Sequence, residues 1–193
     1  MSGAGAAECW SVGVMGQHTD ASHHSTPSTL RSPRIVTLGV YGATEAGFFG
    51  ALQAAGVDTF CDIRLRRGVR GRDYAFVNST RLQARLAELH IRYLHFKELA
   101  PSRALRDRQS AADKTSHTAK RKRTGLSELF VTGYCEERLQ SFDSGKFIAQ
   151  LGNEARVVAL FCVERAPAAC HRSLVAQRLQ TDLGIEVVHL TPE

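Results

Sequence analysis

The residues best suited to chemistry lie close together near the end of the chain: Cys162, Glu164, Cys170, His171 and Arg172. Cys170 stands at the expected start of a helix, beside His171 and Arg172. Unpaired backbone N–H groups and neighbouring cations favour a thiolate in such a place. We therefore predict Cys170 as a nucleophile, with His171 or Glu164 as its acid/base partner. The alternative is that Cys162 and Cys170 are small buried thiols with a structural role.

Apolar periodicity predicts the elements that position these residues. Five short apolar or β-rich runs, at 34–40, 57–63, 91–96, 157–162 and 185–190, are typical of strands. Helical spacing appears at 44–55, after Asn78, and at 126–139, 142–151 and 169–183, with Thr44 and Asn78 as N-caps. Alternating strands and helices favour right-handed crossovers and a parallel sheet. We expect a single α/β domain over residues 34–193, a Rossmann-like three-layer sandwich with a mainly parallel five-stranded sheet.

The predicted sheet also indicates where a ligand would bind. In an open parallel sheet, ligands bind beyond the carboxyl ends of the strands, where the strand order reverses. With the order 3-2-1-4-5, the first and fourth strands are neighbours there. We predict an anion site made by Arg64, Arg172, Asp62 and Tyr41, facing the cysteines. Alternatively, Arg172 is a surface arginine paired with Glu164 or Asp62, and Asp62 only holds Arg64. We expect His95 and His189 to be hydrogen-bonded core histidines.

The charge distribution favours an anionic partner. The chain has a formal net charge of +6, and its basic residues crowd the segment after the second strand and the polar segment 97–126. We read 97–126 as a long basic loop inserted in the domain. Guanidinium groups suit phosphate oxygens, which indicates a phosphorylated small molecule or a nucleic acid as partner. A non-catalytic nucleic-acid-binding module that uses these basic loops is the alternative, and two solvated loops would explain the charge equally well.

Several named motifs are excluded. A cysteine-phosphatase loop requires an arginine at a fixed distance after its cysteine, where this chain has Ala168 and Ala176. Neither GxGxxG nor GxxxxGK[ST] occurs. Cys162, Cys170 and His171 could form a metal site, but adjacent residues at a helix start rarely converge on one ion. We therefore predict no metal and no cofactor.

The remaining features indicate the kind of protein. Residues 1–33 are polar, non-periodic and without the basic start and apolar block of a signal peptide, so we expect a disordered leader. No run approaches the ~20 apolar residues of a membrane span. The five cysteines are odd in number and show no CxxC spacing, which argues against a disulfide framework. We expect a soluble cytoplasmic protein with no membrane partner, and the sequence does not indicate its oligomeric state.

Taken together, these motifs resemble those of a bacterial family, domain-of-unknown-function family four hundred and eighty-eight. The C-x-E…C-H-R pattern of that family is matched by Cys162-Val163-Glu164 and Cys170-His171-Arg172, and its D-V-R by Asp62-Ile63-Arg64. Weaker features match at Ile91-Arg92-Tyr93 and Glu98-Leu99. The resemblance spans most of 35–190. Leu65, Arg66 and Arg67 stand where the family usually has a Pro and a Ser-Arg. The resemblance implies a Rossmann-like α/β fold and supplies no reaction.

Overall fold

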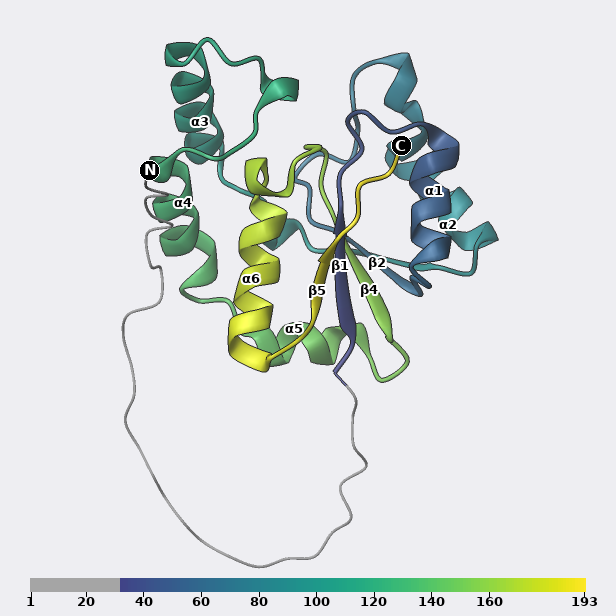
Figure 1. Cartoon of the computed structure of the whole chain (residues 1–193). Coiled ribbons are helices and arrows are strands. Elements are labelled where there is room, and N and C mark those ends of the chain that lie inside the picture. Colours follow the sequence, from purple (N-terminus) through teal and green to yellow (C-terminus); the bar gives the residue numbers. More distant parts are fainter. Residues whose placement is uncertain (1–31) are drawn as a thin grey trace, which may run out of the picture.

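Five parallel strands form the centre of the molecule in the computed structural model, which describes residues 32–193 (Figure 1). The strands are β1 (Arg34–Leu38), β2 (Thr59–Asp62), β3 (Arg92–His95), β4 (Val157–Phe161) and β5 (Val187–His189). They lie in the order β3-β2-β4-β1-β5, and every neighbouring pair is parallel. The predicted α/β fold with a parallel five-stranded sheet is confirmed. Most of the predicted leader lies outside the described residues.

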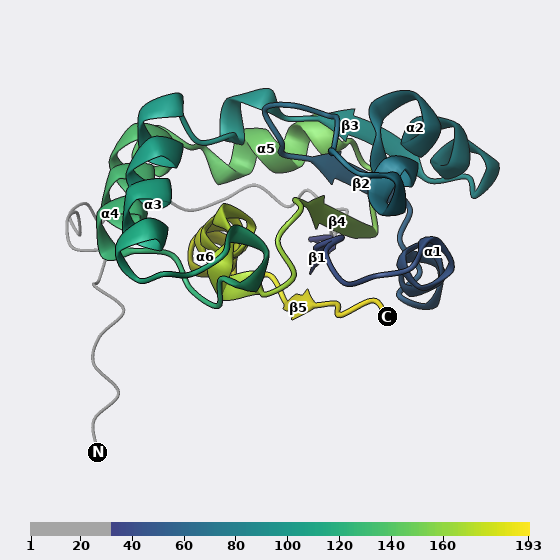
Figure 2. The ribbon, with the colours of Figure 1, turned by 90° about the horizontal axis from the view of Figure 1, so that it is seen from above.

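Helices cover both faces of this sheet (Figure 2). On one face lie α1 (Glu45–Ala54) and α2 (Ser79–Glu88); on the other lie α4 (Glu128–Tyr134), α5 (Ser144–Leu151) and α6 (His171–Leu183). Side chains alternate along each strand, so Val158 and Leu160 pack towards α6 while Ala159 and Phe161 pack towards α1. The result is a Rossmann-like sandwich of three layers with a separate apolar core on each side of the sheet.

The predicted strand order is wrong at two neighbouring positions, because β1 and β4 are exchanged. We predicted β1 between β2 and β4, but β4 lies between β2 and β1, with Thr59 opposite Val158 and Arg34 opposite Val157. Periodicity shows that strands exist and that they are parallel, but not which strands pair. The strand VVALF has its last four residues fully buried, which suits this central place. The helices that follow β1 and β4 lie on opposite faces, so the two strands still meet where the direction of winding changes.

The segment 97–126, which we expected to be a loop, contains a helix. It consists of η2 (Lys97–Leu99), α3 (Arg103–Thr115) and η3 (Lys120–Lys122). The Ser102 hydroxyl caps α3 by accepting a hydrogen bond from the Leu105 N–H at 3.2 Å. The buried face of α3 is Leu105, Gln109 and Asp113, spaced four residues apart. Two of these three residues are polar, so the helix carries no apolar stripe that periodicity could detect.

The two predicted N-caps have different outcomes. Thr44 caps α1 as expected, since its Oγ1 accepts a hydrogen bond from the Gly47 N–H at 3.0 Å. Asn78 occupies the cap position of α2, but its side chain makes no capping bond. Its Oδ1 accepts instead from the Val69 N–H at 2.6 Å. The Asn78 side chain therefore fixes the arginine-rich loop after β2 rather than the helix.

The loops that follow β1 and β4 are joined at their backbones. The Val163 carbonyl accepts hydrogen bonds from the N–H groups of Val40 and Tyr41, at 3.1 and 3.0 Å. Beside them, Gly39 lies so close to the Glu164 carbonyl that a Cβ at Gly39 would stand 1.8 Å from that oxygen. Only glycine allows this approach.

Replacing Gly39 by alanine therefore tests the loop contact. Because both sides of the clash are backbone, Gly39→Ala should lower the free energy of unfolding by about 1–3 kcal/mol, the usual cost of overpacking. Gly50→Ala is the matched control: Gly50 lies in α1 with open space around it, so an alanine should stabilise the protein by about 0.5–1 kcal/mol. Urea denaturation measures both, and equal effects of the two substitutions would contradict the contact.

Candidate ligand site at the carboxyl edge of the sheet

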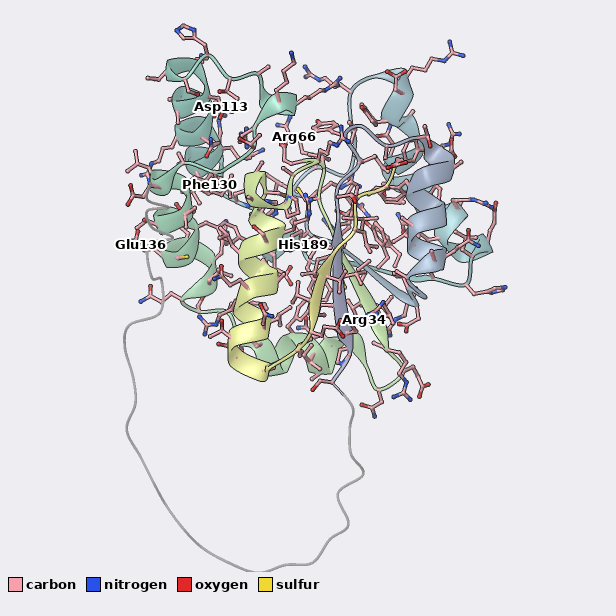
Figure 3. The ribbon with its side chains drawn as sticks, viewed as in Figure 1. Arg34, Arg66, Asp113, Phe130, Glu136 and His189 are labelled. Carbon is pink, nitrogen blue, oxygen red and sulfur yellow. The ribbon has the colours of Figure 1, made fainter. Side chains whose placement is uncertain are left out.

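A pocket of about 390 Å³ opens beyond the carboxyl ends of β2 and β4. Its lining comes from the loops after β1, β2 and β4, from the start of α6, from α3, and from the segment between η3 and α4. In Figure 3, Arg66 and Asp113 lie at this end of the molecule, while Arg34, at the start of β1, lies towards the other end. The pocket thus lies on the edge at which the strand topology predicts ligand binding.

The floor of the pocket contains two thiols and an imidazole. Cys162, Cys170 and His171 are all buried and all line the pocket. His171 Nδ1 is 3.9 Å from the Sγ atoms of both cysteines. On the other side of the ring, His171 Nε2 lies 3.2 Å from the carbonyl oxygen of Ile63. A carbonyl only accepts hydrogen bonds, so Nε2 carries a hydrogen and Nδ1 is the nitrogen that faces the sulfurs.

Local backbone geometry explains why these three residues meet. Cys162 directly follows β4, at a strand position whose side chain points towards α6. Cys170 is the N-cap of α6 and has an extended backbone (φ −141°, ψ 139°), whereas His171 begins the helix. The chain turns between them, which lets two adjacent side chains face one space. The expectation that adjacent Cys170 and His171 do not converge is therefore wrong: the ligand atoms of Cys162, Cys170 and His171 all lie within 4.8 Å of one another.

The two thiols differ in acidity. Burial raises the pKa of Cys170. A hydrogen bond from the Cys162 thiol, the electrostatic effect and hydrogen bond of His171, and the charge of Arg172 lower this pKa by more, so that it lies well below its ordinary value. The hydrogen bond to Cys170 and burial together raise the pKa of Cys162 well above its ordinary value. Of the two thiols, Cys170 is therefore the one whose surroundings favour the thiolate.

Arg64 forms the wall beside β2. Its Nε and Nη2 donate to the two carboxylate oxygens of Asp62 at 2.8 and 2.7 Å, and Nη2 also donates to the Val77 carbonyl at 3.0 Å. The third nitrogen, Nη1, is buried and has no hydrogen-bond partner among the described residues. Asp62 does not line the pocket, whereas Arg64 does. Asp62 therefore holds Arg64 in place, which was the alternative interpretation of its role, and Arg64 Nη1 has no partner among the described residues.

The structure does not bring Arg172 to the pocket. Its side chain is fully buried, and it is not among the lining residues. Nη1 and Nη2 donate to the carbonyl oxygens of Glu164 and Arg165 at 2.5 and 2.9 Å. These bonds pin the loop after β4 to the first turn of α6. Arg172 is thus not a surface arginine, and in this structure its guanidinium positions Glu164.

The other predicted residues lie as follows. Tyr41 and Glu164 line the pocket. Burial, and then the charge of Glu164, raise the pKa of Tyr41. The guanidinium of Arg121 lies 5.0 Å from the Tyr41 ring centre, and Tyr41 meets Tyr74 edge to face. His95 and His189 are hydrogen-bonded as expected, to the Arg64 carbonyl and to the Thr37 hydroxyl, both at 2.8 Å. The expectation that they are core residues is wrong, because His95 is half-buried and His189 is exposed.

Sequence reasoning missed the wall that α3 and the following segment supply. This wall includes Arg106, Gln109, Ser110, Arg123, Leu126 and Phe130. Arg123 is fixed by an ion pair with Asp113 at 2.7 Å, in which both side chains are mostly buried. The density of arginines in 97–126 was the only signal for this wall. Nothing in the sequence showed that α3 packs on α4 and closes over the edge of the sheet.

These features define a class: an α/β protein with an arginine-rich pocket above a thiol–imidazole floor. The chain matches the family described as Domain of unknown function DUF488 over residues 45–179, more than half its length, and it belongs to that family. The match includes both motif regions, although it assigns no role to their residues. No curated protein and no solved structure matches the chain. Within residues 32–193, no helix is long and apolar enough to cross a membrane.

The role of Arg172 can be tested by its effect on stability. Arg172→Met leaves the carbonyl groups of Glu164 and Arg165 without their donors. Each unsatisfied group costs about 1–3 kcal/mol, so we expect the free energy of unfolding to fall by at least about 2 kcal/mol. Arg66→Met, the same substitution at an exposed pocket arginine, should change the stability by less than about 0.5 kcal/mol. Chemical denaturation measures both. If the two variants are equally stable, Arg172 does not hold the loop.

Proposed function

We propose that this protein binds a phosphorylated ligand in the pocket and acts on it at the Cys170–His171 floor. One observation carries the proposal: six arginines line the pocket, against one carboxylate, that of Glu164. The six are Arg64, Arg66, Arg70, Arg106, Arg121 and Arg123. A guanidinium is planar, stays charged at all ordinary pH values, and matches two phosphate oxygens with two parallel N–H donors.

Much of this charge is not neutralised within the protein. Arg64 pairs with Asp62, and Arg123 with Asp113. The other four arginines form no ion pair within the described part of the chain. They come from three separate segments and are Arg66, Arg70, Arg106 and Arg121. Bringing like charges together around one cavity is unfavourable unless an anion enters it. The buried Nη1 of Arg64 adds a donor that has no partner among the described residues and that a bound ligand would satisfy.

The size of the pocket favours a small molecule over a duplex. Pockets for small molecules and cofactors usually measure about 300–1,000 Å³, and this pocket, at about 390 Å³, lies within that range. A phosphorylated metabolite or a mononucleotide has a suitable volume. The exposed side chains of Arg66, Arg70 and Arg121 stand at the rim, where they would attract the anion before it reaches Arg64.

The reacting groups that we propose are those at the floor. The sulfur of Cys170 would attack the phosphorus of the bound ester, forming an S–P bond as the ester P–O bond breaks, and His171 Nδ1, 3.9 Å from the Cys170 sulfur, would accept the thiol proton. Glu164 lines the same pocket and is the acid available to a leaving group. The geometry supports these roles through proximity: the thiol, the base and the arginines share one cavity, and His171 is oriented by the Ile63 carbonyl.

Titration calorimetry with adenosine monophosphate and with inorganic phosphate tests the binding. The double variant Arg70→Gln/Arg121→Gln should weaken phosphate-ester binding by at least about tenfold, because each hydrogen bond to a charged group contributes about 1.5–3 kcal/mol. The control Arg72→Gln/Arg156→Gln removes the same charge from exposed positions outside the pocket. Salt screens exposed charges that lie outside the pocket, so the affinity of this control variant for the phosphate ester should fall by less than about threefold.

A short single-stranded oligonucleotide distinguishes the alternative, a nucleic-acid-binding module. If the basic loops bind nucleic acid, log K should fall with log salt by about 0.7 for each phosphate neutralised. Both double variants should then lose affinity equally. That result, or a wild-type protein that binds no phosphate ester, would overturn the pocket proposal.

A further inference from the structure

We propose that Cys162, Cys170 and His171 form a binding site for a Zn²⁺ ion at the floor of the pocket. The inference goes beyond the proposed function, because it concerns the floor alone and needs no phosphorylated ligand. It rests on three observations: the spacing of the three ligand atoms, the orientation of the imidazole, and the position of the cluster inside the pocket.

The spacing is close to that of a tetrahedral zinc centre. Zn–S bonds of about 2.3 Å and Zn–N bonds of about 2.0–2.1 Å place a sulfur and a nitrogen ligand about 3.6 Å apart, and two sulfur ligands about 3.8 Å apart. Here, His171 Nδ1 is 3.9 Å from Cys162 Sγ and 3.9 Å from Cys170 Sγ. All three ligand atoms lie within 4.8 Å of one another. Shifts of a few tenths of an ångström would bring the two sulfur–nitrogen distances to the zinc values.

The imidazole is already oriented as a ligand. A metal-bound histidine usually donates its other ring N–H to a carboxylate or a backbone carbonyl, which fixes both the tautomer and the ring plane. His171 Nε2 lies 3.2 Å from the Ile63 carbonyl in this way, so the Nδ1 lone pair faces the two thiols. The ring of Tyr134 packs 5.5 Å from the His171 ring, and the Tyr134 hydroxyl donates to the Leu99 carbonyl at 2.6 Å. These contacts resist rotation of the imidazole.

The ligand set selects the metal. Thiolate and imidazole together suit zinc better than magnesium or calcium, which prefer oxygen ligands. Three protein ligands leave one tetrahedral position open, the arrangement found in catalytic rather than structural zinc sites. Because all three residues line the pocket, the open position faces the cavity that the arginines surround. Zinc would thus place an electrophile where the phosphate group of a bound ligand would lie.

Metal binding and free thiol chemistry exclude each other at this site. A Cys170 thiolate that is bound to zinc cannot act as the nucleophile described above. The zinc-bound form and the nucleophilic form are therefore separate states, which an experiment can distinguish.

Cobalt substitution tests the site directly. The purified full chain, stripped with a chelator and titrated with Co²⁺, should give the visible bands of a tetrahedral ion and a near-ultraviolet thiolate-to-cobalt band. Zn²⁺ should then displace the cobalt. The thiolate band is required because His18, His23 and His24 could also bind a metal ion, but without sulfur.

Variants identify the ligands. Cys162→Ser and Cys170→Ser should each remove about half of the thiolate band. Each should also lower the affinity for Zn²⁺, and by more than the roughly 10–100-fold that is lost when a residue that only orients a ligand is removed. His171→Gln should weaken Zn²⁺ similarly while keeping the thiolate band. Cys61→Ser is the matched control, because Cys61 is an equally buried free cysteine outside the cluster; it should bind both metals like the wild-type protein.

A second measurement does not depend on whether the variants fold. With the wild-type chain, Zn²⁺ should protect Cys162 and Cys170 from iodoacetamide, as mapped by mass spectrometry, without changing the labelling of Cys61. An octahedral cobalt spectrum without a thiolate band, or labelling that zinc does not change, would overturn the proposal. The zinc site and the phosphate-binding pocket can be tested independently of each other. The variant Arg70→Gln/Arg121→Gln should bind zinc normally, and Cys162→Ser should still bind adenosine monophosphate.

Discussion

The site depends on how the loop after β4 is held. Besides the backbone hydrogen bonds that Val163 accepts from Val40 and Tyr41, two contacts to backbone hold it. Gly39 lets the end of β1 approach the Glu164 carbonyl, and the buried guanidinium of Arg172 donates to the Glu164 and Arg165 carbonyls from inside α6. A buried carbonyl without a donor is costly, so the position of this loop is strongly determined. Because Cys162 precedes the loop and Cys170 follows it, fixing the loop also fixes the distance between the two thiols.

Asp62 and Arg64, at the end of the neighbouring strand β2, are fixed by hydrogen bonds in a similar way. Burying a charge is costly unless it is paired and hydrogen-bonded. Asp62 accepts two bonds from Arg64 and a further one from the Tyr93 hydroxyl at 2.9 Å, so its own charge is well compensated. Arg64 is compensated on one side only, and its Nη1 remains unpartnered among the described residues. The pair therefore holds a cation at the pocket wall in a fixed orientation, as the proposed anion site requires.

The sequence predicted the framework of the site but not how it closes. Apolar runs and helical spacing located β4 and α6, and the strand topology indicated that Arg64 and Cys162 would share an edge. Three features could not be read in this way. The buried face of α3 is mostly polar, so Gln109 and Asp113 gave no helical signal. Arg172 looked like an anion ligand because a sequence does not show that a guanidinium is buried among carbonyls. Cys170 and His171 converge because of one extended residue at a helix start, a backbone detail with no signature in residue types.

Charge connects the two proposals for this pocket. Two thiolates and one Zn²⁺ ion sum to zero, so a zinc-bound floor would leave to a phosphorylated ligand the four pocket arginines that form no ion pair within the described residues. Without a metal, a thiolate at the floor would itself attract the neighbouring guanidinium groups and compete with the phosphate, since both are anions in a cavity of low dielectric constant. Zinc would therefore strengthen anion binding at the arginines without touching them. By linkage, a bound phosphate ester would favour the zinc-bound floor by the same factor.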